Sequence, residues 1–77
     1  MKSYNYRILL RKEPEGGFTV TVPVLQGCIS YGDTIDTAIE NTKEAIELYI
    51  ETLIEYNEEI PSEDGILEYN LSVNYNA

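Results

Sequence analysis

Few side chains in this sequence are of the types that perform chemistry. The chain has no histidine and one cysteine, Cys28. A cysteine nucleophile needs a base beside it, and a cysteine-based zinc site needs further Cys or His ligands. A lone cysteine among apolar residues is more typical of a core. We therefore predict neither nucleophilic catalysis nor a disulfide framework.

Carboxylates are the other side chains that could perform chemistry, because the chain has 14 Asp and Glu residues. Metal-dependent nucleases gather several carboxylates around two cations that activate water. Asp33 and Asp36 are the obvious candidates, since both lie near an expected helix start. There Asp33 is more typical of a helix cap, and Asp36 of a partner for the positive end of the helix dipole. We predict no catalytic residue, no metal ligand and no cofactor, and hence a protein that is not an enzyme.

Length and charge restrict the class of partner. The chain has 77 residues, which predicts one domain over residues 1–77 and leaves little room for a buried cofactor. Its formal net charge of −9 removes the main energetic term of phosphate binding, so we expect no direct nucleic-acid binding and favour a basic protein partner. A base-stacking role is disfavoured for the same reason. We expect packing in the core and at interfaces instead for Tyr4, Tyr6, Tyr69 and Tyr75.

Two further features exclude other classes. Gly16 and Gly17 predict a turn and not a phosphate loop, because no Lys-Ser or Lys-Thr pair follows and no helix begins there. Polar residues interrupt the start of the chain, and no later stretch approaches 18 uncharged apolar residues. We therefore expect a cytoplasmic protein with no membrane-spanning segment.

Hydrophobic periodicity predicts four strands and one helix. Apolar residues alternate with polar ones over 4–11, 18–22 and 67–75, and the short run 27–31 fits a further strand. Apolar residues at intervals of three and one predict a long amphipathic helix from about 34, with Asn57 at its end. The predicted fold class is α+β, in the order βββαβ, with the helix packed on one face of a four-stranded, mostly antiparallel sheet.

The predicted helix carries an acidic side with repulsive i,i+4 spacing. This side contains Lys43 and five glutamates, our candidate partner-binding residues: Glu40, Glu44, Glu47, Glu51 and Glu55. Two interpretations remain open at this stage. The side is either a surface that attracts a basic partner, or a solvated face that keeps a small domain soluble.

The stretch from Gly16 to Thr34 closely resembles the HicB antitoxin family. The features that carry the resemblance are Gly16-Gly17-Phe18, Pro23-x-Leu25-x-Gly27-Cys28 and Gly32-Asp33-Thr34, followed by a helix and then by Ile60-Pro61. The resemblance implies a small α+β domain whose last strand lies beside its first. It also implies a protein that binds and silences HicA, a basic ribonuclease with a double-stranded-RNA-binding-like fold and a catalytic histidine.

The chain departs from the family pattern at three places. Thr37 stands where Glu is usual, so a reciprocal capping box with Thr34 cannot form, and Asn57 stands where Gly is usual. Many family members continue into a C-terminal DNA-binding domain, whereas this sequence resembles the short, stand-alone members. Promoter binding is therefore not expected of it.

These observations lead to a functional hypothesis. We expect an antitoxin-like binding protein that occludes a HicA-type ribonuclease, and the alternative is an orphan HicB-like interaction or ligand-binding module without a toxin. We also expect a homodimer or higher homo-oligomer, because the core is small and sheet edges need cover. Leu9 and Leu48 are apolar residues that we expect to face away from the core.

Overall fold

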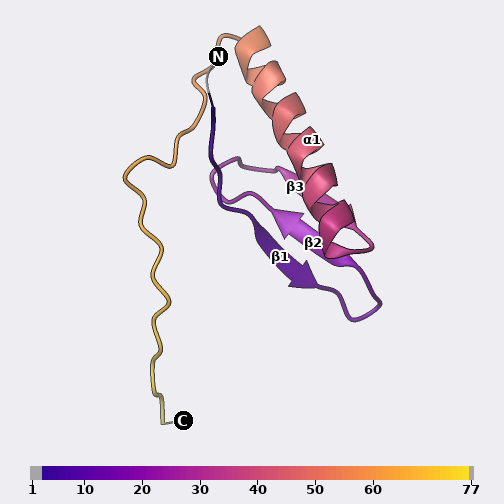
Figure 1. Ribbon diagram of the computed structural model, residues 1–77. Helices are drawn as coiled ribbons and strands as arrows, with labels where there is room; N and C mark the ends of the chain where they lie inside the picture. The colour runs from indigo at the N-terminus through magenta and orange to yellow at the C-terminus, as the bar shows by residue number, and fades with distance from the viewer. Residues whose placement is uncertain (1–2, 77) are drawn as a thin grey trace.

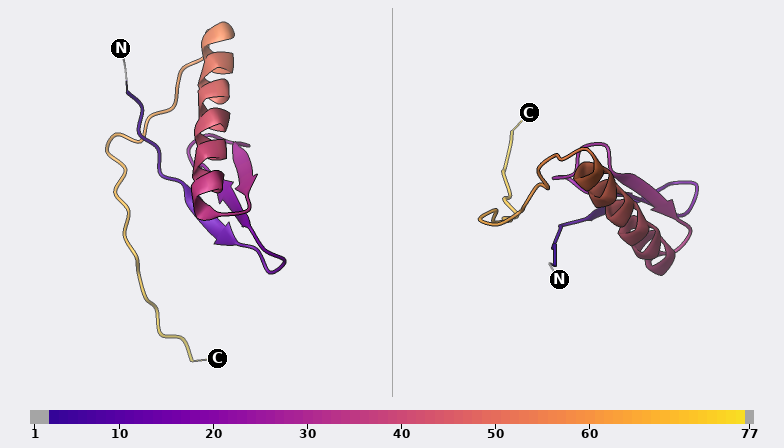
Figure 2. Two further views of the ribbon diagram at one scale, coloured as in Figure 1. Left: turned by 45° about the vertical axis from the view of Figure 1, so that its right-hand side comes forward. Right: turned by 90° about the horizontal axis from the view of Figure 1, so that it is seen from above.

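The structure is a computed structural model that describes residues 3–76, and it contains three strands and one helix (Figure 1). The strands are β1 (Leu9–Lys12), β2 (Phe18–Thr21) and β3 (Ile29–Gly32), and the helix is α1 (Ile35–Glu55). They form an antiparallel sheet in the order β1-β2-β3, and α1 covers one face of it (Figure 2). The α+β class and the single helix on one face of the sheet are confirmed.

The β1–β2 hairpin forms at the predicted turn. Lys12 pairs with Phe18, and the turn between them is closed by a hydrogen bond from the Glu13 backbone N–H to the Gly17 carbonyl at 3.0 Å. Gly16 and Gly17 have φ angles of 108° and 79°, a left-handed region that side chains with a Cβ rarely adopt. The two glycines are therefore required by the turn.

The core lies where the loop between β2 and β3 folds back under α1. Backbone N–H groups of Leu25 and Cys28 donate to the carbonyls of Val22 and Leu25, each at 3.0 Å, and these internal hydrogen bonds hold the loop in a compact turn. Val22, Leu25 and Cys28 form a buried cluster. Side chains of the N-terminal segment, the loop and the helix pack against this cluster, namely Tyr6, Ile8, Val24, Ala45, Ile46 and Tyr49.

Both ends of α1 are capped, the start by Thr34 and not by Asp33, and the end at the predicted Asn57. Thr34 is the N-cap, and its hydroxyl oxygen accepts a hydrogen bond from the Thr37 backbone N–H at 3.1 Å. The Thr34 hydroxyl also donates to the Thr37 hydroxyl at 2.9 Å, a contact that stands in place of the capping box. At the other end Asn57 has φ 55°, and the N–H groups of Asn57 and Glu58 donate to the carbonyls of Ile54 and Leu53. This pattern is a Schellman motif.

Two strand predictions need correction. The first strand begins at Leu9 and not at Tyr4, because residues 4–8 are extended without a paired strand in the described structure. The predicted fourth strand, 67–75, is not found: this segment is extended, but no strand within residues 3–76 pairs with it. Alternation specifies a strand-like segment, whereas a strand also needs a neighbouring backbone for its hydrogen bonds. Residues 66–76, which we call the tail, run away from the sheet (Figures 1 and 2).

Candidate partner-binding surface

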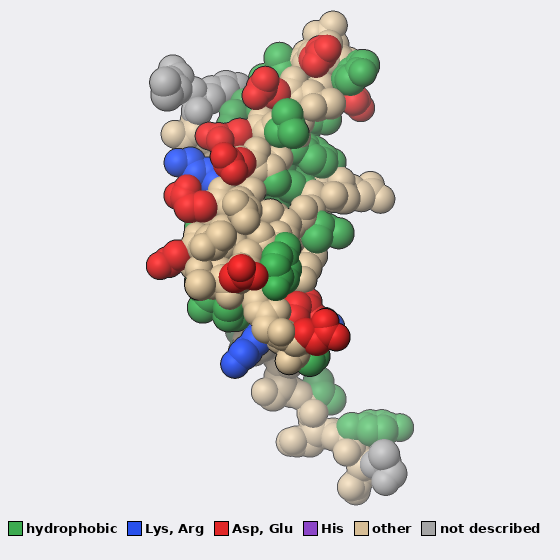
Figure 3. Space-filling model, turned by 90° about the vertical axis from the view of Figure 1, so that its right-hand side faces the viewer, with side chains coloured by type: hydrophobic (Ala, Val, Ile, Leu, Met, Phe, Trp, Pro, Cys, Tyr) green, Lys and Arg blue, Asp and Glu red, His purple; other side chains and the backbone are tan. Residues whose placement is uncertain are grey.

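The five glutamates form one exposed stripe along α1. Glu40, Glu44, Glu47, Glu51 and Glu55 are all exposed, and their spacing of three and four residues places them within about one quarter of the helix circumference. The buried residues Ala38 and Thr42 lie on the opposite side of the helix, against the sheet. We call these five residues the acidic stripe, and carboxylates gather over this part of the surface in the space-filling view (Figure 3).

An apolar groove lies beside the acidic stripe. It runs between α1 and the start of β3, and it is lined by Gly27, Cys28, Ile29, Ala45, Leu48, Tyr49, Thr52 and Leu53. Leu48 and Ile29 are 64% and 63% exposed, so the prediction that Leu48 faces away from the core is confirmed. Sequence reasoning missed Ile29, because a residue in a short strand that follows a loop carries no clear alternation. Leu48 joins the groove to the acidic stripe on the helix surface.

Asp33 and Asp36, the residues considered for catalysis, lie at the start of α1. Thr34, and not Asp33, is the N-cap, and Asp36 lies in the first turn of α1, where a negative charge is favourable. Within residues 3–76 no group of three or more His, Cys, Asp or Glu side chains is arranged to hold a metal ion. Cys28 is 6% exposed, and its burial raises the pKa of its thiol, which lowers the fraction of reactive thiolate.

The Gly32-Asp33-Thr34 motif forms the corner between the sheet and the helix. A Cβ atom on Gly32 would lie 2.2 Å from the backbone nitrogen of Ala38, so only glycine lets β3 approach α1 this closely. The Asn41 side-chain amide donates to the Tyr31 carbonyl at 2.7 Å and ties the second helical turn to the same corner. This corner sets the direction in which α1, and with it the acidic stripe, crosses the sheet.

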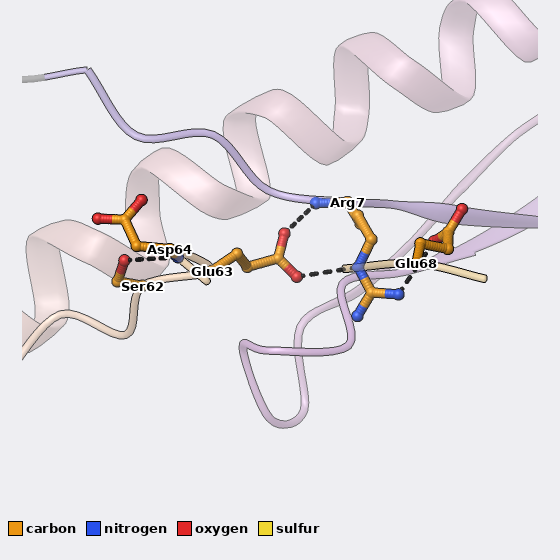
Figure 4. A network of polar contacts seen from close by, with 5 residues as sticks. All are labelled: Arg7, Ser62, Glu63, Asp64 and Glu68. Carbon is orange, nitrogen blue, oxygen red and sulfur yellow. Dashed lines mark hydrogen bonds and ion pairs between the residues drawn. The ribbon is translucent and has the colours of Figure 1, made fainter. Parts of the chain in front are cut away.

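A polar network joins the N-terminal segment to the residues that follow α1 (Figure 4). The Glu63 carboxylate accepts hydrogen bonds from the Arg7 backbone N–H and, at 3.1 Å, from Arg7 Nε. Arg7 Nη1 donates to Glu68 at 3.0 Å, and the Tyr6 hydroxyl donates to the Pro61 carbonyl at 2.7 Å. The Ile60-Pro61 motif therefore lies where the chain returns to the N-terminal segment.

The fold and surface define a small α+β module with an exposed acidic helix. No helix within the described residues 3–76 has the length and apolar character needed to cross a membrane. The family model described as "HicB_like antitoxin of bacterial toxin-antitoxin system" matches residues 6–77. The chain belongs to this HicB-like antitoxin family, which confirms the resemblance found in the sequence.

Two relatives match most of the chain. A UPF0150 protein of Synechocystis is 52% identical over 65 residues, covering 84% of this chain and 82% of the relative. A UPF0150 protein of Thermoplasma acidophilum is 42% identical over 60 residues, covering 78% and 87%.

Two solved structures of the Burkholderia pseudomallei antitoxin HicB resemble the chain. The N-terminal domain matches with a TM-score of 0.62 and 45% identity over 71% of this chain and 63% of that one. The longer structure matches with a TM-score of 0.66 and 40% identity over 88% of this chain. The present chain corresponds to 46% of the length of that longer antitoxin structure.

Proposed function

We propose that the protein neutralises a basic HicA-type ribonuclease by binding it and covering its active site, with no chemistry of its own. The observation that carries the proposal is the acidic stripe, presented by a helix of a HicB-like antitoxin fold. The relatives with solved structures are named antitoxins, a class defined by a toxin partner.

Charge supports the choice of a basic partner. Lys43 is the one basic residue of α1, while the stripe presents five carboxylates to solvent. Charges arranged in this way raise the rate of encounter with an oppositely charged protein. The same carboxylates would bind the cationic RNA-binding surface of the toxin in competition with RNA phosphates. This electrostatic competition would add to steric occlusion of the active site.

The apolar groove supports a stable contact next to the steering charges. Protein interfaces commonly combine an apolar centre with a polar rim. Leu48, at the border between the groove and the acidic stripe, is suited to become buried at such a centre. We propose that the toxin contacts both surfaces.

The test compares two variants of equal net charge. The toxin is first identified by co-purification from the native cell, where a basic chain containing histidine is expected. In the first variant Glu44, Glu47 and Glu51 are replaced by Gln; in the control, Glu15 and Glu59 are replaced by Gln and Asp64 by Asn. At low salt, stopped-flow mixing should show association of the stripe variant slowed about tenfold, and that of the control much less. Raising the salt concentration should slow the wild type towards the stripe variant.

Two results would contradict the proposal at different levels. Equal association rates for both variants at every salt concentration would mean that the stripe is a solvated face only. If the wild-type protein binds the co-purified partner but leaves its RNA cleavage unchanged, neutralisation of a ribonuclease is the wrong function.

A further inference from the structure

The sheet has an unpaired edge at β1. Within the described residues β1 forms strand hydrogen bonds with β2 on one side, and no strand lies on its other side. An open edge presents a row of backbone donors and acceptors that can pair with another extended chain. β1 is therefore ready to accept a further strand.

The tail has the sequence of a strand, but no strand within residues 3–76 pairs with it. Its odd-numbered positions are apolar and 75–92% exposed, and they comprise Leu67, Tyr69, Leu71, Val73 and Tyr75. The even-numbered positions between them are Glu68, Asn70, Ser72 and Asn74. This alternation is that of a strand with one buried face. Five consecutive apolar side chains on one face form an exposed surface that needs a cover.

Apolar surface beside the free edge of β1 is also left uncovered. Leu10 pairs with the fully buried Val20, so it points to the helix side of the sheet, yet it is 38% exposed. Ile39 on α1 is 44% exposed and lines a groove together with Tyr4, Ile8 and Ile50. A strand added beside β1 would place its apolar face over these residues.

The path of the chain directs the tail away from its own sheet. Arg7 forms ion pairs with Glu63 and Glu68 (Figure 4), and beyond Glu68 the tail diverges from β1 (Figures 1 and 2). The radius of gyration is 15.1 Å, whereas a compact chain of this length has one of about 11–12 Å. The molecule is elongated because one strand-forming segment lies outside it.

We propose that two copies of the chain form a two-fold dimer by exchanging tails, so that the part of each tail beyond Glu68, residues 69–76, adds as an edge strand to β1 of the other copy. Each copy then gives one strand and receives one, which closes the assembly and leaves no unpaired tail. Charge permits this contact although the chain is strongly acidic. Glu68 is the one charged residue in the tail, and it is already paired with Arg7. The exchange does not depend on the proposed toxin.

The first test measures the dimer itself and uses two adjacent positions on opposite faces of the tail. Sedimentation equilibrium of the full chain should show a dimer at about 100 µM. Leu71→Asp should raise the dimer dissociation constant at least tenfold, because it puts a charge on the face that becomes buried. Ser72→Asp adds the same charge on the other face and should leave the dissociation constant within about threefold.

The second test separates exchange from other arrangements and uses the wild-type chain. Labelled (13C,15N) and unlabelled chains are mixed, unfolded and refolded together, and isotope-filtered NMR then detects contacts between different copies. Contacts of Tyr69 and Val73 with β1 should appear between copies. A monomer, a dimer whose tail contacts β1 only within one copy, or a dimer unaffected by Leu71→Asp would each overturn the proposal.

Discussion

Gly32 is the residue on which the sheet-to-helix corner depends. A Cβ atom there would lie 2.2 Å and 2.5 Å from the backbone N and Cα of Ala38. Backbone atoms cannot rotate away as the end of a side chain can, so relief requires β3 and α1 to separate. The corner is therefore sensitive to the addition of a single methyl group.

We predict that Gly32→Ala destabilises the fold by about 2–3 kcal/mol, because overpacking against backbone forces the two elements apart. Gly27→Ala is the matched control: Gly27 has φ 81°, and its Cβ would meet nothing within 4 Å. The control carries only the conformational cost of about 1 kcal/mol. Urea unfolding followed by circular dichroism gives both values, and equal losses would exclude the collision as the cause.

Sequence reasoning at the residue scale succeeded where local chemistry decides the outcome. The helix end at Asn57 follows from the tolerance of asparagine for left-handed backbone, whereas Asp33 and Thr34 both suit a helix start, and only the structure identifies Thr34 as the N-cap. The replacement of the capping box by a contact between two hydroxyls required the structure. The collision at Gly32 also required the structure, because it depends on how closely the backbones of β3 and α1 approach each other.

One carboxylate, that of Glu63, accepts two of the hydrogen bonds that join the segment after α1 to the N-terminal segment. The Glu63 side chain is 11% exposed and accepts a hydrogen bond from the Arg7 backbone N–H, which lowers its pKa, and the Arg7 side chain lowers it further. A lowered pKa means that folding favours the charged form. This contribution to stability is present at neutral pH and is lost as the pH falls below the ordinary Glu value of 4.5 through the lowered pKa.

We therefore predict that wild type and Glu63→Gln differ in stability at pH 7 and that this difference shrinks as the pH falls below 4.5. Glu68→Gln is the control, since Glu68 pairs with the same arginine but is 65% exposed, and it should show a smaller difference at pH 7. Thermal unfolding at a series of pH values provides the comparison. A wild-type advantage that persists unchanged at pH 3 would show that the Glu63 charge is not what holds the segment.

Element-scale prediction worked where one element can satisfy itself. The helix was predicted because its backbone hydrogen bonds are internal and its apolar residues recur with helical spacing. The tail has an equally clear alternation, but a strand takes its hydrogen bonds from a neighbour, and alternation does not say in which chain that neighbour lies. The acidic stripe was predictable because helical spacing alone places its glutamates on one side of α1. The apolar groove beside it was not predictable, because it depends on the packing of α1 against β3.

The whole molecule carries its excess of nine negative charges unevenly. The acidic stripe concentrates carboxylates at i,i+3 and i,i+4 spacing, while Glu68 is the one charged residue of the tail. Four of the five basic residues lie within the first 12 positions, and Lys43 is the fifth. Repulsion is therefore greatest on α1, where the proposed toxin would relieve it.

The last prediction concerns the free energy of unfolding of the free protein, which this charge distribution lowers. Replacing Glu44, Glu47 and Glu51 by Gln removes four like-charge neighbour pairs worth about 0.2–0.5 kcal/mol each, so the variant should be more stable than wild type by about 0.8–2 kcal/mol at low salt. Salt should reduce this difference, because at 1 M the Debye length is only about 3 Å. The equal-charge control with replacements at Glu15, Glu59 and Asp64 should gain less, since these residues lie in loops and not in the stripe.

Urea unfolding at about 0.02 M and 1 M NaCl gives these free energies for all three proteins. Equal gains in both variants would show that net charge matters and the stripe's spacing does not. A stripe variant that is more stable yet binds the toxin more slowly would show that the stripe's repulsive spacing serves binding, because folding alone would favour its loss.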